Sequence, residues 1–167
     1  MKSSKNYLFF STKDDRFGLQ ISHSTMKIIL ELCKRAQNQE TGGILVGAYN
    51  ENFSVAVATR ATEPPSDSRA GNAWFRRGIS GLKYLLDRLW QTKREFYLGE
   101  WHFHPFAEPE PSSTDLNELR KIAKTGAYSC PEPVMLIIGG DPQKKWSARA
   151  FVFPNGEDLE MLQKFPQ

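Results

Sequence analysis

Two histidines and one aspartate stand close enough in the chain to bind a single metal ion. His102 and His104 are two of the three histidines in the sequence, and only Phe103 separates them. Because side chains alternate along a strand, the two imidazoles would share one face and Phe103 would lie opposite. Asp115 follows after a proline-rich stretch, in the first turn of a predicted helix. Two imidazoles, one carboxylate and an open fourth position form a catalytic zinc arrangement, not a closed structural one.

Each half of this pattern also has an ordinary structural explanation. A His-x-His pair on a strand can be a surface pair, and Ser112 followed three residues later by Asp115 is typical of a helix N-cap. Neither explanation predicts the other, whereas a metal site accounts for both. The His-Glu-x-x-His signature of many zinc hydrolases is absent, so a general base has to come from elsewhere. Glu100 shares the strand face of His102, and Glu40 precedes a glycine-rich segment at the predicted entry to the sheet.

The elements that must position these residues follow from the hydrophobic periodicity. It predicts strands at 7–11, 17–22, 42–47, 53–59, 96–103, 134–138 and 146–153. It predicts helices at 24–36, 79–92, 112–124 and 157–164, with Ser22 or Ser24 capping the first. The first two strands would form a hairpin, and residues 62–72 would form a surface loop. The interleaved strands and helices predict an α/β fold with one mixed sheet.

Length and composition restrict the class of protein. The chain has 167 residues, 40% of them hydrophobic and 25% charged, which suits one globular domain that needs no disulfide. No apolar run approaches the ~20 residues of a membrane span, and the apolar run near the N-terminus is too short for a signal peptide. With 22 basic and 19 acidic residues, the net charge of +3 indicates neither a nucleic-acid nor a membrane partner. We expect a cytoplasmic protein.

The two cysteines lack the spacing of a metal-binding pair. Cys33 stands in a helical pattern, where a small buried side chain is expected. Cys130 precedes a proline in a predicted loop, where an exposed thiol is expected. A disulfide between them is left open at this point.

Three segments of the sequence resemble the JAMM motif of the MPN+ (JAB-domain) metalloproteases, in the family's order and spacing. They are Glu40-Thr-Gly-Gly-Ile-Leu-Val-Gly, Gly99-Glu-Trp-His-Phe-His-Pro105 and Ser112-x-x-Asp115. The match covers residues 40–115 directly and, through the order of elements, about 17–155. It implies that residues 1–167 form one MPN (JAB) domain. The fold implied is α/β, with a mixed central β-sheet flanked by helices and cytidine-deaminase-like layering. Phe103 departs from the Ser or Thr of many members, which implies altered packing and retained activity.

The resemblance also implies a role for each residue of the motif. His102, His104 and Asp115 would hold one Zn²⁺ per chain, together with a metal-bound water. Zinc would polarise the scissile carbonyl and lower the pKa of the water toward ~7. Glu40 would take a proton from that water and deliver it to the leaving amine. Ser112 would donate a hydrogen bond to the tetrahedral oxyanion.

Enzymes of this family cut peptide or isopeptide bonds after the C-terminal tail of ubiquitin or a ubiquitin-like protein. The short form with Gly99-Glu-Trp101 before the histidines is most similar to bacterial JAB peptidases found beside conjugation machinery in anti-phage (CBASS-type) operons. The resemblance therefore implies a deconjugating isopeptidase in antiviral defence, acting on a conjugated protein such as a cyclic-nucleotide synthase. Trp74, Arg76 and Arg77 combine aromatic and basic side chains beside the predicted loop, and we expect them to contact the substrate tail. The oligomeric state is not indicated.

Four other interpretations remain at this point. A catalytically silent MPN scaffold would bind no metal, although such members generally lack ligands that are present here. A zinc nucleobase deaminase would need His-x-Glu and Pro-Cys-x-x-Cys, and Cys130 has no such partner. A cysteine hydrolase would use Cys130 and would be insensitive to chelators. A peptidase that processes a small sulfur-carrier protein is a variant of the favoured class.

Overall fold

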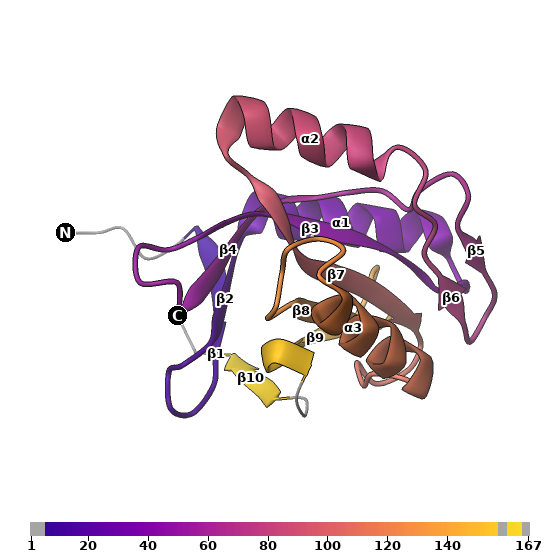
Figure 1. Ribbon diagram of the computed structural model, residues 1–167. Helices are drawn as coiled ribbons and strands as arrows, with labels where there is room; N and C mark the ends of the chain where they lie inside the picture. The colour runs from indigo at the N-terminus through magenta and orange to yellow at the C-terminus, as the bar shows by residue number, and fades with distance from the viewer. Residues whose placement is uncertain (1–5, 157–159, 165–167) are drawn as a thin grey trace.

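Eight strands close into a barrel, which three helices cover (Figure 1). The structure is a computed structural model that describes residues 6–156 and 160–164. The barrel order is β1-β10-β9-β8-β7-β3-β4-β2, in which β2 pairs with β4 and β7 with β8 in parallel and the other neighbours are antiparallel. The strands are β1 (Tyr7–Ser11), β2 (Gly18–Ser22), β3 (Thr41–Tyr49), β4 (Val55–Ala61), β7 (Phe96–Pro105), β8 (Val134–Gly140), β9 (Trp146–Val152) and β10 (Glu160–Lys164). The expected mixed sheet with flanking helices is confirmed, and it also closes on itself.

The helices divide the hydrophobic core between the two faces of the sheet. They are α1 (His23–Ala36), α2 (Leu82–Lys93) and α3 (Ser113–Thr125). Helix α1 packs with the barrel interior, which includes Trp101 and Phe103 of β7. Helix α2 packs on the opposite face against β3 and β7, and α3 packs against β8 and β9. Strand β7 therefore has core on both of its faces.

The alternation of side chains along β7 shifts once, at a bulge. Leu45 pairs with Gly99, but the next residue, Val46, pairs with Tyr97, so Leu98 is the extra residue of the bulged strand. Because of that extra residue, Tyr97 and Glu100 face the same side although they are three residues apart, and a hydrogen bond of 3.4 Å joins them. Gly99 is required beside the extra residue, since a Cβ on it would lie 1.9 Å from the carbonyl oxygen of Val134.

Four expectations from the sequence differ from the structure. Residues 160–164 form strand β10, which closes the barrel, so the predicted terminal helix is wrong there; its residues 157–159 lie outside the described residues. The second helix is expected to begin at Ile79 but begins at Leu82, because Gly81 before it has the left-handed conformation. Ile79 therefore lies outside the helix and is 69% exposed. The predicted 62–72 loop contributes a short strand β5 (Arg69–Ala70), which pairs with β6 (Phe75–Arg76). Cys130 is buried, not exposed, and it packs under α2.

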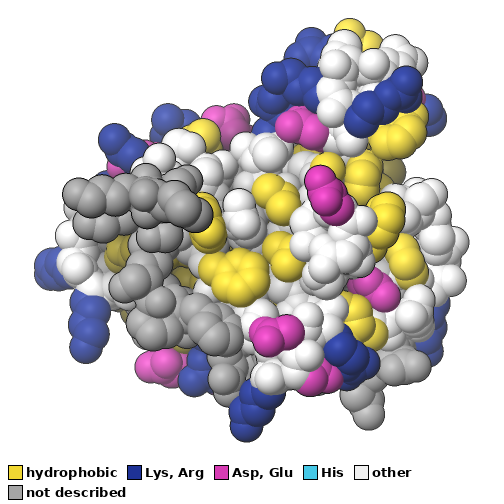
Figure 2. Space-filling view, turned by 90° about the vertical axis from the view of Figure 1, so that its left-hand side faces the viewer, with side chains coloured by type: hydrophobic (Ala, Val, Ile, Leu, Met, Phe, Trp, Pro, Cys, Tyr) yellow, Lys and Arg dark blue, Asp and Glu magenta, His cyan; other side chains and the backbone are white. Residues whose placement is uncertain are grey.

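The predictions for the first elements of the chain are confirmed. The β1–β2 hairpin and the β3–β4 pair form, and Ser22 caps α1 through its hydroxyl, which accepts a hydrogen bond from the backbone of Thr25. Both cysteines are free and buried. Among the described residues, none of the helices combines the length and apolar character that a membrane crossing requires. Viewed from the left of Figure 1, Lys and Arg side chains gather over α2, above apolar and acidic side chains (Figure 2).

We predict that Gly99→Ala destabilises the fold strongly, because its Cβ would meet the backbone of β8 where neither strand can move aside. Overpacking of this kind costs about 1–3 kcal/mol or more, and each kcal/mol lowers the Tm of a domain this size by roughly 2–4 °C. Gly126→Ala is the matched control, since Gly126 also has a positive φ (64°) but faces open space. Thermal unfolding followed by circular dichroism compares them; equal Tm values for the two variants would contradict the role of the bulge.

Candidate metal centre

His102 and His104 lie side by side on the outer face of β7. Trp101 and Phe103 point to the opposite face and pack in the barrel interior, which confirms the alternation expected from the sequence. His102 pairs with Gly42 of β3 on one side and with Ile137 of β8 on the other. His104 pairs with Gly139 of β8 near the end of β7, and the side chains of the two histidines are 7% and 9% exposed.

Helix α3 brings Asp115 to the same face through its N-terminal cap. The Ser112 hydroxyl accepts a hydrogen bond from the backbone N–H of Asp115 (3.1 Å), and the Asp115 carboxylate accepts one from the backbone N–H of Ser112 (2.7 Å). This reciprocal capping box fixes the carboxylate in the first turn of α3. The N-cap explanation considered from the sequence is thus correct, and the same carboxylate also contacts the histidines.

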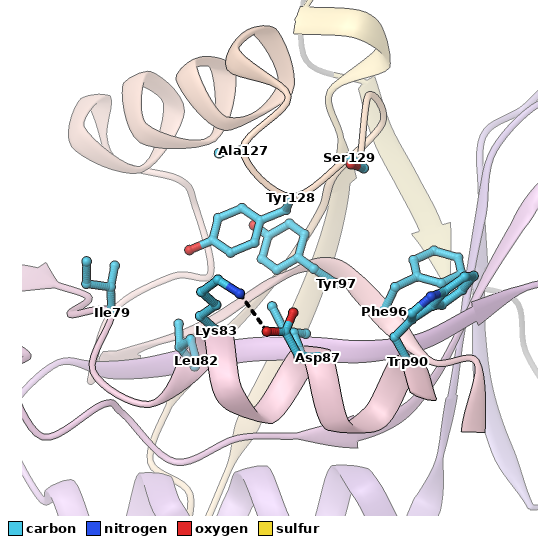
Figure 3. A pocket seen from close by; sticks show the side chains of 11 residues that line it. Ile79, Leu82, Lys83, Asp87, Trp90, Phe96, Tyr97, Ala127, Tyr128 and Ser129 are labelled. Atoms are coloured by element: carbon cyan, nitrogen blue, oxygen red, sulfur yellow. Dashed lines mark hydrogen bonds and ion pairs between the residues drawn. The ribbon is translucent and has the colours of Figure 1, made fainter. Parts of the chain in front are cut away.

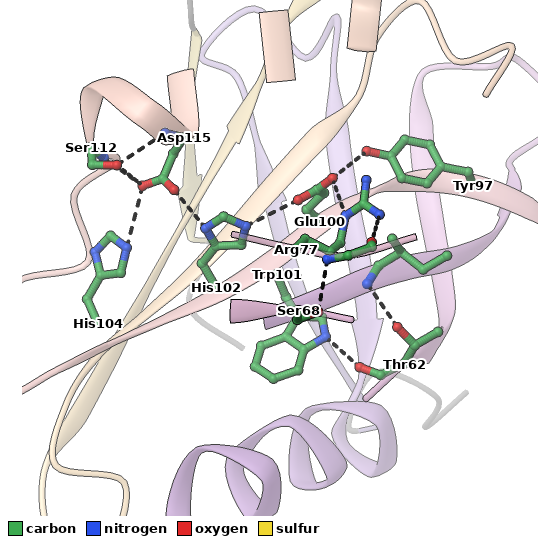
Figure 4. Close-up of polar contacts among 12 residues, drawn as sticks. Thr62, Ser68, Arg77, Tyr97, Glu100, Trp101, His102, His104, Ser112 and Asp115 are labelled. Atoms are coloured by element: carbon green, nitrogen blue, oxygen red, sulfur yellow. Dashed lines mark hydrogen bonds and ion pairs between the residues drawn. The ribbon is translucent and has the colours of Figure 1, made fainter. Parts of the chain in front are cut away.

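The three side chains converge within the reach of one ion (Figure 4). Asp115 Oδ1 lies 2.8 Å from His102 Nδ1, and Asp115 Oδ2 lies 3.5 Å from His104 Nε2. One ligand atom from each of the three residues lies within 4.8 Å of the others. His104 Nε2 is fully buried and has no hydrogen-bond partner among the described residues. A buried imidazole nitrogen without a partner is costly, so the group is compatible with a metal ion that this nitrogen would bind.

The charges around His102 favour a cation at this place. Burial by itself would lower the pKa of His102, but its hydrogen bonds to Asp115 and Glu100 outweigh burial and raise that pKa to about 9. Burial would raise the pKa of the Asp115 carboxyl, but its contacts with His102 and His104 hold it far below its usual range. Two ionised carboxylates thus flank the imidazole, and they stabilise positive charge in the cluster.

Glu40 stands at the rim of this cluster, one residue before β3 begins. Thr41 pairs with Phe103, so the backbone pairing places Glu40 beside the end of β7 where His104 lies. Its side chain is half-buried, and its backbone N–H donates to the carbonyl of Gly71 (2.9 Å). Burial raises the pKa of the Glu40 carboxyl, opposed by His104 and reinforced by Asp115. A carboxyl that holds its proton more readily than usual suits acid–base chemistry near neutral pH.

Glu100 adds an interaction that the sequence only suggested. Its Oε2 lies 3.2 Å from His102 Nε2, on the side of the ring opposite Asp115. Its Oε1 accepts a hydrogen bond from Arg77 Nε (2.8 Å), and both side chains are nearly buried, 5% and 10% exposed. The shared strand face pointed to the contact with His102, but no sequence signal pointed to Arg77 as its partner.

The structure separates the three residues predicted to contact a substrate tail. In the two-residue strand β6, Phe75 is buried and its ring lies edge-on to His102 (5.5 Å between centroids). Arg77, which follows β6, also turns inward and reaches Glu100. Trp74 and Arg76 point outward and are exposed. All three nitrogens of the Arg77 guanidinium contact groups of the protein, namely Glu100, the Gly78 carbonyl and the Tyr128 hydroxyl. Contact with a substrate stays a prediction for Trp74 and Arg76, whereas the guanidinium of Arg77 is engaged inside the protein.

A cavity of about 760 Å³ lies between α2 and the turn after α3 (Figure 3). It is mainly apolar and is lined by Leu82, Leu86, Trp90, Phe96, Tyr97 and Tyr128, among others. None of the three clustered residues or Glu40 lines it. The candidate metal centre on β7 and α3, whose three side chains are buried, is therefore separate from this cavity.

Comparison with known proteins gives one family for most of the chain. Residues 22–152 match the family described as prokaryotic homologues of the JAB domain (Prok-JAB). The chain is 45% identical over 148 residues to a protein of Enterobacter hormaechei subsp. hoffmannii named CD-NTase/cGAS isopeptidase, covering 89% of this chain and 82% of that protein. It is 30% identical to "Probable metalloprotease y4qB" of Sinorhizobium fredii, covering 79% and 81%. A protein of Escherichia coli, also named CD-NTase/cGAS isopeptidase, is 31% identical over 80% of this chain and 83% of its own length.

A solved structure shares the fold. The solution structure of protein DSY2949 from Desulfitobacterium hafniense superposes with a TM-score of 0.62 at 16% identity, covering 86% of this chain and 88% of that one. At this identity the likeness concerns the fold alone.

We predict that Arg77→Ala lowers stability much more than Arg76→Ala, although the two arginines are neighbours. Removing Arg77 takes the guanidinium of the ion pair away from the buried Glu100 carboxylate, and breaking a buried ion pair in this way costs about 3–5 kcal/mol. That cost corresponds to a fall in Tm on the order of 10 °C. Arg76 is exposed, so its replacement is expected to change stability by no more than about 0.5 kcal/mol.

Thermal and urea unfolding of the two variants measure this difference. Equal stability of both variants would show that the ion pair of Arg77 and Glu100 does not form in solution.

Proposed function

The chain belongs to the prokaryotic JAB-domain family and is a hydrolase of the JAMM type, and on this premise we propose that it is a zinc-dependent isopeptidase that releases a conjugated protein. The observation that carries the proposal is the buried Nε2 of His104, which has no hydrogen-bond partner in the described part of the chain. Beside Asp115 and His102, this nitrogen completes a set of two imidazoles and one carboxylate, the donor set of a catalytic zinc.

The side chains of the site would act as follows. His102, His104 and Asp115 would hold one zinc ion, which when bound polarises the scissile carbonyl and activates water. Glu40 would accept the proton of the attacking water and return it to the leaving amine nitrogen. Its half-buried place beside the cluster supports this role, because burial raises its pKa toward the working range of a general base.

Ser112 would stabilise the oxyanion after a rotation of its hydroxyl. Its single proton points to Asp115 Oδ2 (2.7 Å), so it cannot also serve a substrate in that orientation. If the hydroxyl turns, Oδ2 still accepts a hydrogen bond from the backbone N–H of Ser112. Ser112 is exposed, so its proton can reach a substrate while the helix cap keeps Asp115 in place.

The substrate proposal comes from the relatives and from β6. Because two of the relatives are named CD-NTase/cGAS isopeptidase, we propose a conjugated CD-NTase, a cyclic-nucleotide synthase, as the substrate of this chain. The reaction would reverse conjugation in a bacterial anti-phage system in the cytoplasm. Strands β5 and β6 pair with each other over two residues each, and an extended tail can add to such an edge. Trp74 and Arg76 would contact that tail.

A catalytically silent scaffold is the second candidate, and the metal content separates it from the enzyme. We predict about one zinc per chain in the wild type and little in His104→Ala, because that variant removes a ligand from the cluster. Elemental mass spectrometry of the purified proteins measures this. His23→Ala is the matched control, since His23 lies at the start of α1 outside the cluster and its loss should leave the zinc content unchanged. A wild type without zinc, even after reconstitution, would favour the scaffold.

We predict that Glu40→Gln keeps its zinc but loses isopeptidase activity by about 10²–10⁴-fold, because an amide cannot carry the proton. The assay follows release of a CD-NTase from a purified covalent conjugate on a denaturing gel. Glu63→Gln, on the exposed segment after β4, is the control and should cleave as the wild type does. Undiminished activity of Glu40→Gln would rule out Glu40 as the general base.

A further inference from the structure

The ion pair of Glu100 with Arg77 lies directly behind His102, and the proposed mechanism assigns it no role. Both side chains are nearly buried. A buried ion pair adds little net stability compared with apolar residues of the same size, because both charges lose their hydration. The contacts of the Glu100 carboxylate point to a role other than stability.

Within the described part of the chain, each hydrogen bond of the Glu100 carboxylate involves a partner that can donate. Oε1 accepts from Arg77 Nε (2.8 Å) and from the Tyr97 hydroxyl (3.4 Å). Oε2 faces His102 Nε2 at 3.2 Å. An ionised carboxylate can only accept hydrogen bonds, so His102 Nε2 has to carry a proton to make this contact.

The position of that proton decides what the other ring nitrogen can do. A neutral imidazole carries one proton, so with Nε2 protonated the Nδ1 atom presents its lone pair. Nδ1 is the nitrogen that faces Asp115 and the cluster, 2.8 Å from Asp115 Oδ1. A metal ligand must be an unprotonated nitrogen. Asp115 by itself would draw the proton to Nδ1, and the carboxylate on the opposite side of the ring counteracts this.

We propose that Glu100 is a positioning residue that holds His102 as the Nε2–H tautomer, with Nδ1 directed at the metal centre, and that Arg77 holds Glu100 in place. The inference rests on the proposed metal site. Arg77 is itself fixed by the Gly78 carbonyl (2.8 Å) and by the Tyr128 hydroxyl (3.2 Å). Since Arg77 directly follows β6, the same ion pair also ties the β5–β6 segment to a metal ligand.

The variant Glu100→Gln tests the tautomer with almost no change of volume. Because Arg77 can only donate, the amide oxygen stays with Arg77 and the amide NH₂ turns toward His102. His102 Nε2 then has to accept, and the proton moves to Nδ1, where it competes with the metal. We expect zinc affinity to fall about 10–100-fold, measured by competition with a chromogenic chelator. We also expect the visible absorption spectrum of the Co²⁺-substituted protein to change.

Tyr97→Phe is the matched control. It removes the other donor to the Glu100 carboxylate without touching the Oε2 atom that faces His102. Zinc affinity and the Co²⁺ spectrum should match those of the wild type. Wild-type affinity and an unchanged spectrum in Glu100→Gln would overturn the proposal.

A measurement on the wild type tests the tautomer of His102 directly, even if Glu100→Gln does not fold. The chain has three histidines, so ¹⁵N-histidine labelling and long-range ¹H–¹⁵N correlation of the zinc-loaded protein give three ring patterns, assigned with His23→Ala and His104→Ala. We expect His102 to carry its proton on Nε2. A proton on Nδ1 in zinc-loaded protein would overturn this inference and leave the proposed function standing, whereas a wild type that binds no zinc would overturn both.

Discussion

Strand β7 is packed against the hydrophobic core on both of its faces, and the rest of the site depends on which side chains it directs to each face. Its inward side chains, Trp101 and Phe103, are fully buried in the barrel interior, while His102 and His104 point outward. Alternation puts Glu100 on the same face as the histidines, and the bulge before Glu100 brings Tyr97 to that face as well. The parallel contact with β8 allows this only because Gly99, next to the extra residue Leu98, has no side chain. Packing and chemistry thus use the same ten-residue strand.

The buried charges of the site are arranged in an alternating order. Arg77, Glu100, His102 and Asp115 follow one another through contacts of 2.8–3.2 Å, so each acidic group lies between donors. This order avoids an unpaired buried charge, which would cost several kcal/mol. His104 is the member whose buried nitrogen has no hydrogen-bond partner among the described residues. The series of alternating donors and acceptors therefore ends at His104 Nε2, where a bound cation would supply the missing partner.

At the start of α3 and at β6, local secondary structure and long-range contacts both determine how the side chains of the site lie. The Asp115 carboxylate accepts the backbone N–H of Ser112 at the start of α3 and at the same time contacts both histidines. At the end of β6, two neighbours that look equivalent in the sequence differ: Arg76, in the strand, faces solvent, and Arg77, which follows it, reaches Glu100. Aromatic and basic residues in a row therefore supply two separate roles, one structural and one available for a substrate.

The sequence by itself determined the features that depend on local periodicity and spacing. These are the faces of β7, the helix cap at Ser112, the mixed sheet and the three motif segments. Only the tertiary structure decided the closure of the barrel by β10, the burial of Cys130 and the pairing of Arg77 with Glu100. The physical reason is that strand pairing at 160–164 and burial under α2 are set by partners far along the chain. Local propensity favoured a helix at the C-terminus, and long-range hydrogen bonding outweighed it.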